Sequence, residues 1–108
     1  MEVFTVGLCG PGRHDIPQVS EDNFLFPMMV ENPMDFSAHY NTAFEFISNL
    51  PEEAKVELYV TGFTPVLTSF LSAWVQVNDQ RRRAGSSTRP LTLYHYNRES
   101  SGYEPHLF

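Results

Sequence analysis

The chain has 108 residues, is 42 % hydrophobic and 14 % aromatic, and carries a formal net charge of −6. This length allows one domain, 1–108, and the composition excludes a disordered chain. The acidic balance argues against binding of duplex DNA, whose affinity comes largely from phosphate neutralisation. No apolar run is long enough to cross a membrane, and no basic leader is present. Cys9, the single cysteine, excludes an internal disulfide and a cysteine-rich zinc module. We therefore expect a cytoplasmic protein.

Charge is distributed unevenly along the chain. Residues 1–79 hold eleven acidic and two basic side chains, whereas residues 80–108 hold five arginines and two glutamates. The basic run QRRRAGSSTR, at 80–89, is typical of a solvated loop, and local contact with an anion is the alternative interpretation.

The first predicted element is a buried strand at 3–9, because Val3 to Cys9 is a β-branched and apolar run that stops at Gly-Pro-Gly. Residues 10–35 follow as a proline-rich insertion loop, whose prolines forbid a long helix. Within it, the apolar cluster at 24–29 must either cover the core or form a partner surface.

Apolar residues at helical spacing predict a helix over 36–50, with Asp35 or Ser37 as its N-cap and Pro51 as its end. A second strand is expected at 56–60. Glu57 in this strand indicates either an edge position or one polar face.

The next element is a helix from Thr64 to about Val77, with Thr64 as N-cap and Pro65 at the first helical position. Trp74 lies on its apolar stripe. Two more strands are expected at 91–96 and 103–108, the last pairing back as a hairpin. Because strands alternate with amphipathic helices, we expect an α/β fold. It would be a small Rossmann-like three-layer domain, with a mainly parallel sheet and a C-terminal β-hairpin strand.

Ligands of such sheets bind at the carboxyl ends of the strands, which selects the loops at 7–16, 61–65 and 95–99. In the second loop, Gly62 lets a ligand approach the backbone, and a helix N-terminus opens directly after it. A phosphate would be held by backbone amides and two hydroxyls, from Thr61, Gly62, Phe63 and Thr64. An ordinary turn with a threonine cap explains the same residues, and no Walker or dinucleotide motif is present.

The other two loops supply further candidates. In the first, Gly10 and Gly12 stand beside Arg13 and His14, which suits a phosphate or carboxylate, although an exposed charged turn has the same composition. The third offers possible ligand contacts and a proton carrier, from His95, Tyr96 and Arg98. His95 shares a strand face with Leu91 and Leu93, where a histidine more often packs than catalyses. The histidines lack metal-ligand spacing, so no metal and no cofactor is expected.

Two stretches, LYVTGFTPVLTSFLSAW and LTLYHYNRESSGY, resemble the strand–TG–helix–strand half of small CRISPR-associated Rossmann-like proteins, which include CARF-like proteins and ring nucleases. The segment HDIPQVSEDNF resembles the loop after their first strand. The resemblance covers about half the chain and implies a homodimer that holds a cyclic oligoadenylate across its two subunits. It carries over Thr61, Gly62 and Thr64 as ligand-facing residues, together with the loop from Gly10 to His14. The proline-rich segment at 11–33 departs from that group.

Two function hypotheses follow. The first is a cyclic oligonucleotide binder, with a metal-independent ring nuclease of a type III CRISPR system as its catalytic form. In such an enzyme Arg13 or the helix amides would stabilise charge on the phosphate, and His14 or His95 would move protons to give a cyclic-phosphate product. The alternative is a non-catalytic phage or host interaction protein, such as an anti-defence inhibitor, that docks through its acidic and apolar surface.

Overall fold

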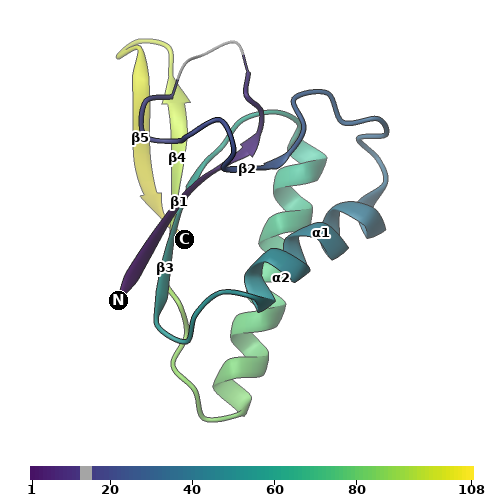
Figure 1. Ribbon diagram of the computed structural model, residues 1–108, viewed down its shortest axis with the longest axis vertical. Helices are drawn as coiled ribbons and strands as arrows, with labels where there is room; N and C mark the ends of the chain where they lie inside the picture. The colour runs from purple at the N-terminus through teal and green to yellow at the C-terminus, as the bar shows by residue number, and fades with distance from the viewer. Residues whose placement is uncertain (13–15) are drawn as a thin grey trace.

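The computed structural model describes residues 1–12 and 16–108 (Figure 1). The elements in chain order are β1 (Glu2–Cys9), β2 (Phe24–Phe26), α1 (Phe36–Ser48), β3 (Ala54–Tyr59), α2 (Thr64–Arg83), β4 (Leu91–Asn97) and β5 (Gly102–Leu107). In the described residues the strands form one sheet with the order β2-β1-β3-β4-β5. The first four strands in this order run parallel and β5 is antiparallel to β4. This confirms the expected α/β fold with a C-terminal hairpin.

The two helices cover the same face of the sheet (Figure 1). The chain steps from β2 through α1 to β3, and through α2 to β4, always in one direction across the sheet. Right-handed crossovers therefore place both helices on one side. The step from β1 to β2 runs in the opposite direction, so its connection covers the other face, where Ile16 and Val19 pack against Tyr59. The third layer is thus formed by a loop rather than by a helix.

The main core lies between the sheet and the helices. Its largest fully buried side chains come from three strands, β1, β3 and β4, and from both helices: Phe70, Leu8, Ile47, Leu58, Leu91, Val56 and Val66. Trp74 is only 3 % exposed and stacks on Phe70, with ring centroids 6.1 Å apart. This confirms the predicted place of Trp74 in the core.

The interpretation of residues 10–35 as a loop throughout was wrong, because β2 lies within them. Phe26 is buried and contacts the ring of His39 edge-to-face, at 5.7 Å between centroids. The imidazole Nε2 of His39 also bonds the carbonyl oxygen of Pro33, at 3.0 Å. Half of the apolar cluster therefore covers the core, and Met28 and Met29 stay exposed.

The second helix is longer than expected and begins differently. It continues to Arg83, because the Arg81 guanidinium donates to the Glu52 carboxylate, at 3.2 Å, and to the Ser87 carbonyl, at 3.0 Å. Three arginines in the last turn also suit the negative end of the helix dipole. At the other end Phe63 is the N-cap, with no side-chain cap bond. Thr64 is already helical, so the predicted threonine cap was wrong.

The polar residue in β3 marks a polar face, not an edge. The strand is central, and its Glu57 carboxylate accepts hydrogen bonds from the Thr5 hydroxyl and the Tyr94 phenol, both at 3.2 Å. Asp35 caps α1 as expected, accepting from the Ala38 amide at 3.2 Å. Among the described residues, no helix combines the length and the apolar character needed to cross a membrane.

Candidate functional site: a pocket at the carboxyl edge of the sheet

A pocket of about 490 Å³ opens where β1, β3 and β4 end, as expected for a parallel sheet. It is mostly apolar, and its described lining residues are Cys9, Gly12, Met28, Met29, Val60, Thr61, Gly62, Tyr96 and Tyr103. Volume and character are those of a small-molecule site. No histidine, carboxylate, lysine or arginine lies among these described lining residues.

The hydroxyl of Thr61 ties the end of β3 to the end of β1. Its Oγ1 donates to the carbonyl oxygen of Cys9 and accepts from the Cys9 amide, at 3.0 Å. The hydroxyl proton is therefore already used within the fold. The expectation that Thr61 donates to a phosphate was wrong, and its role is to hold two strand ends together beneath the pocket.

Two features of the fold require a glycine at position 62: its backbone conformation and the close approach of Cys9. Its φ is +90°, and an added Cβ would lie 2.6 Å from both Cβ and Sγ of Cys9. The missing side chain therefore makes room for Cys9 and not for a ligand. Gly62→Val would distort this turn whether or not a ligand binds there, so it cannot test binding.

Cys9 sits between the turn and the start of α2. The amide of Phe63 donates to its sulfur, but burial raises the pKa of the Cys9 thiol above its ordinary value. Cys9 is only 2 % exposed and stays a protonated, apolar part of the wall. Because the Phe63 amide is occupied, the amides of Gly62 and Thr64 are the ones left at this helix start for an anion.

Tyrosine rings form the other wall of the pocket. Tyr96 on β4 pairs in register with Tyr103 on β5, and their rings meet edge-to-face with centroids 5.4 Å apart. Tyr103 also meets Tyr59 at 5.1 Å, and Tyr59 stacks on Tyr94 at 4.6 Å. Burial raises the pKa of Tyr59, Tyr94 and Tyr103, so these phenols remain neutral at physiological pH.

The structure brings only some of the predicted site residues together. Gly12, Thr61, Gly62 and Tyr96 line the pocket, whereas Phe63 and Thr64, at the start of α2, are not among its described lining residues. Gly10 does not reach it, because an added Cβ there would meet the Phe24 ring at 2.6 Å.

His95 and Arg98 are exposed and do not line the pocket. His95 points to the opposite face of the hairpin from Tyr96, toward His106, with ring centroids 6.0 Å apart. Because His95 is exposed, the interpretation of it as a packed residue was wrong, and its role as a proton carrier stays a prediction. Arg13 and His14 lie outside the described residues.

Sequence reasoning missed most of the apolar lining: Cys9, Met28, Met29, Val60 and Tyr103. The sequence did indicate Met28 and Met29, because they belong to an apolar cluster that is too large to be left exposed to solvent. Tyr103 could have been found from the hairpin, since the residue opposite Tyr96 shares its face.

Comparisons with family models, with curated proteins and with solved structures found no match for this chain. Within residues 1–12 and 16–108, no three His, Cys, Asp or Glu side chains come together as a possible metal site. The resemblance to CRISPR-associated proteins therefore stays a prediction. The class defined by fold and site is a small Rossmann-like α/β domain with an apolar, tyrosine-lined pocket at its carboxyl edge.

Proposed function

We propose that this protein binds a nucleobase-containing ligand, of the cyclic oligoadenylate class, in the carboxyl-edge pocket. The observation that carries the proposal is the paired rings of Tyr96 and Tyr103 beside two methionines, at the strand ends where nucleotides bind in such folds. Tyrosine rings offer flat surfaces on which a base stacks, and methionines adapt to its outline.

The phosphates of such a ligand would lie at the rim of the pocket, near the start of α2. The amides of Gly62 and Thr64 are the donors available there, and the helix dipole favours an anion at this end. Arg98, in the exposed turn after β4, is the described cation nearest to Tyr96 in the chain. The acidic charge of the whole chain opposes a polyanion, so base stacking has to contribute much of the affinity.

The proposed role is binding without turnover. The described lining holds no histidine, carboxylate or arginine that could move a proton or stabilise a developing charge, and His95 faces the other way. A ring nuclease activity would therefore depend on Arg13 and His14. We place the binding in the cytoplasm, where a free thiol such as Cys9 stays reduced.

A homodimer is part of the proposal, because a symmetric ring ligand fits across a two-fold axis. Met28 and Met29, which line the pocket, also expose apolar surface to solvent, at 49 % and 72 % exposure. Light scattering is expected to give twice the monomer mass when the ligand is added. A monomer with ligand bound would contradict this arrangement.

Calorimetric titration with cyclic tetraadenylate tests the proposal. Tyr96→Leu should weaken binding by about fivefold or more, since stacking on an aromatic ring contributes roughly 1–3 kcal/mol per base. The matched control is Tyr40→Leu, which removes a partly buried tyrosine on α1 that stacks on Phe44 instead. Absence of binding to the wild type, or equal weakening by both variants, would refute the proposal.

A protein-docking role is the second candidate, and one observation favours it. The short segment around the start of α1 exposes four large apolar side chains, each by 49 % or more: Met28, Met29, Met34 and Phe36. Such an exposed group is typical of an interaction surface. Met34→Ser together with Phe36→Ser should abolish docking of a partner protein while leaving cyclic tetraadenylate binding unchanged, because neither residue lines the pocket.

A further inference from the structure

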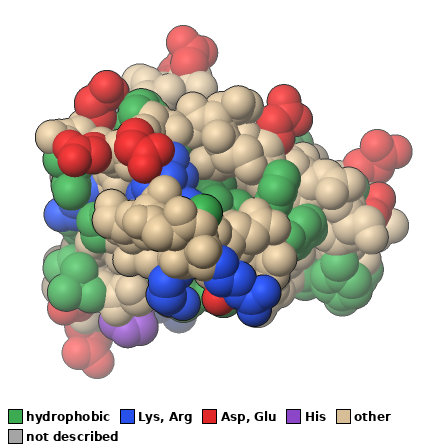
Figure 2. Space-filling model, turned by 90° about the horizontal axis from the view of Figure 1, so that it is seen from below, with side chains coloured by type: hydrophobic (Ala, Val, Ile, Leu, Met, Phe, Trp, Pro, Cys, Tyr) green, Lys and Arg blue, Asp and Glu red, His purple; other side chains and the backbone are tan. Residues whose placement is uncertain are grey.

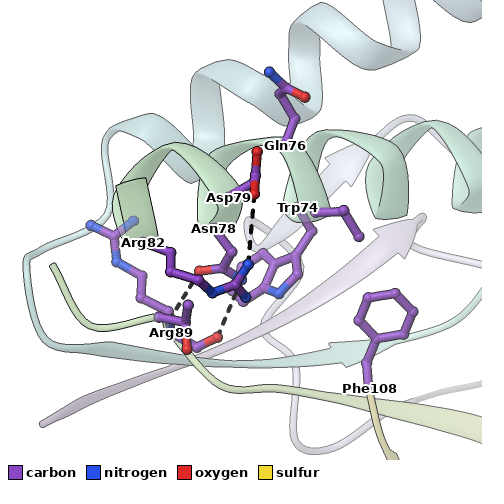
Figure 3. A pocket seen from close by; sticks show the side chains of 9 residues that line it. Trp74, Gln76, Asn78, Asp79, Arg82, Arg89 and Phe108 are labelled. Atoms are coloured by element: carbon purple, nitrogen blue, oxygen red, sulfur yellow. Dashed lines mark hydrogen bonds and ion pairs between the residues drawn. The ribbon is translucent and has the colours of Figure 1, made fainter. Parts of the chain in front are cut away.

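A second pocket, of about 370 Å³, lies at the opposite end of the molecule, beside the connection from α2 to β4 (Figure 3). Its residues come from the second half of α2, from the segment before β4 and from the chain after β5: Trp74, Val75, Gln76, Asn78, Asp79, Arg82, Thr88, Arg89 and Phe108. No part of the proposed nucleotide site reaches it, because the two linings share no residue.

The first argument for a ligand here is an indole N–H without a partner. Trp74 is only 3 % exposed, yet its indole Nε1 makes no hydrogen bond with the described residues. No fully buried side-chain nitrogen lacks a partner in those residues. The N–H must therefore reach an opening, and the pocket is the opening that Trp74 lines. An unpaired donor inside a mostly buried side chain calls for an acceptor.

Arg89 is a buried cation at the edge of the pocket. It is 8 % exposed, and it donates from Nε to the Pro51 carbonyl, at 3.0 Å, and from Nη2 to the Leu50 carbonyl, at 2.9 Å. These two bonds hold the guanidinium toward the turn before β3, and Figure 3 shows it pointing away from the Trp74 ring. The backbone of Arg89 is fixed as well, since its amide donates to the Asn78 side chain at 3.0 Å (Figure 3). Arg89 is a cation held in place before any ligand arrives.

The charges around the pocket favour a single negative charge. Arg82 and Arg89 stand against one acid, Asp79, whose carboxylate lies 3.6 Å from the Arg82 guanidinium. Figure 2 looks at this end of the molecule and shows Lys and Arg side chains gathered there among acidic ones. The charged side chains of the described lining sum to +1, a charge that a monoanion matches and a phosphate dianion exceeds.

The rest of the wall is apolar. Phe108 and Val75 are 53 % and 54 % exposed, and they flank the opening beside the indole ring of Trp74. An aromatic ring and a branched side chain offer a surface for a hydrocarbon body. The polar and apolar parts of the lining are therefore complementary to a ligand with an acidic head and an apolar tail.

We propose that this pocket binds a small organic carboxylate with an apolar body, one of its oxygens accepting from the Trp74 indole N–H. Arg82 and Arg89 add positive charge around this oxygen, and the body lies against Phe108 and Val75. This site does not depend on the proposed nucleotide function.

The chain has one tryptophan, so a single indole N–H resonance in a ¹⁵N-labelled sample reports on the donor directly. The probe is 3-phenylpropionate, titrated to about 10 mM, which nearly saturates a site with a Kd of about 1 mM. The indole resonance should shift with saturation. The neutral amide 3-phenylpropionamide should bind at least about threefold more weakly, because hydrogen bonds to a charged acceptor are the stronger ones.

A matched pair of arginine variants completes the test. Arg82→Gln should weaken binding of 3-phenylpropionate about threefold, a modest effect because this side chain is largely exposed. Arg83→Gln should leave it unchanged, since Arg83 also pairs with Asp79 but does not line the pocket. An indole resonance that does not move, equal binding of acid and amide, or equal effects of the two variants would overturn the proposal.

Discussion

Replacing Gly62 by alanine tests the geometry beneath the carboxyl-edge pocket. Two separate penalties meet at this position. The residue has a φ of +90°, which an alanine adopts only with strain, and its new Cβ would lie 2.6 Å from the Cβ and Sγ of Cys9. Neither contact can be relieved by the far end of a flexible side chain, so β1 or the turn has to move.

The magnitude follows from treating the two penalties separately. A left-handed backbone costs roughly 1–2 kcal/mol for a residue with a Cβ. Forcing an extra methyl group into a packed site costs about 1–3 kcal/mol more. Gly62→Ala should therefore lower the free energy of unfolding by about 2–5 kcal/mol, a large part of what a small domain has.

The matched control is Gly85→Ala, just beyond the end of α2. Gly85 has a similar φ of +82°, but an added Cβ there meets nothing within 4 Å. Its cost should be the backbone strain alone, and the loss of unfolded-chain entropy is the same in both variants. Urea denaturation measures both changes. Equal destabilisation by the two substitutions would refute the role assigned to Cys9.

Three substitutions and one titration test the burial and the hydrogen bonds of the fold. Trp74→Ala should cost about 3–5 kcal/mol in a urea melt, because the ring is almost fully buried; a near-native midpoint would contradict its place in the core. Thr61→Val should cost about 1–3 kcal/mol by leaving the Cys9 backbone unpaired. Thr64→Ala should cost only a few tenths of a kcal/mol, because Thr64 is not the N-cap of α2. A larger cost for Thr64→Ala than for Thr61→Val would contradict the roles given to both threonines. Absorbance titration should show three phenols ionising above their ordinary pKa of 10.0, namely Tyr59, Tyr94 and Tyr103. Because folding raises these three pKa values, the contribution of the phenols to the free energy of unfolding is fully present below pH 10 and is lost as the pH rises through the pKa values of the folded protein. Ionisation of all tyrosines together, before the protein unfolds, would contradict the burial of these three side chains.

Elements with strong local patterns could be predicted from the sequence. The strands at 3–9 and 91–96 and the helix beginning after Asp35 were found because apolar spacing and a capping residue mark them locally. The strand β2 could not be found in this way. It has three residues, no alternation, and prolines nearby, and its pairing with β1 is decided by contacts distant in the sequence.

The other wrong predictions also concern features that are decided by contacts distant in the sequence. The three arginines at 81–83 looked like a loop because their charge suggested solvent, and only the folded chain brings Glu52 against Arg81. A glycine before a helix start indicated a phosphate site, but the neighbour that fills its space is Cys9, 53 residues earlier. Local chemistry thus located the edge of the sheet that holds the pocket. It did not show which side chains, such as Tyr103 or Met29, face into it.

The most direct test of the nucleotide proposal is a titration of cyclic tetraadenylate into protein carrying ¹³C-methyl methionine. The chain has four methionines, of which Met28 and Met29 line the carboxyl-edge pocket while Met1 and Met34 do not. A base stacked on Tyr96 shifts nearby methyl resonances through its ring current, so Met28 and Met29 should move together with saturation, and Met1 and Met34 should stay in place. Four unmoved resonances, or shifts of equal size at all four, would contradict the account.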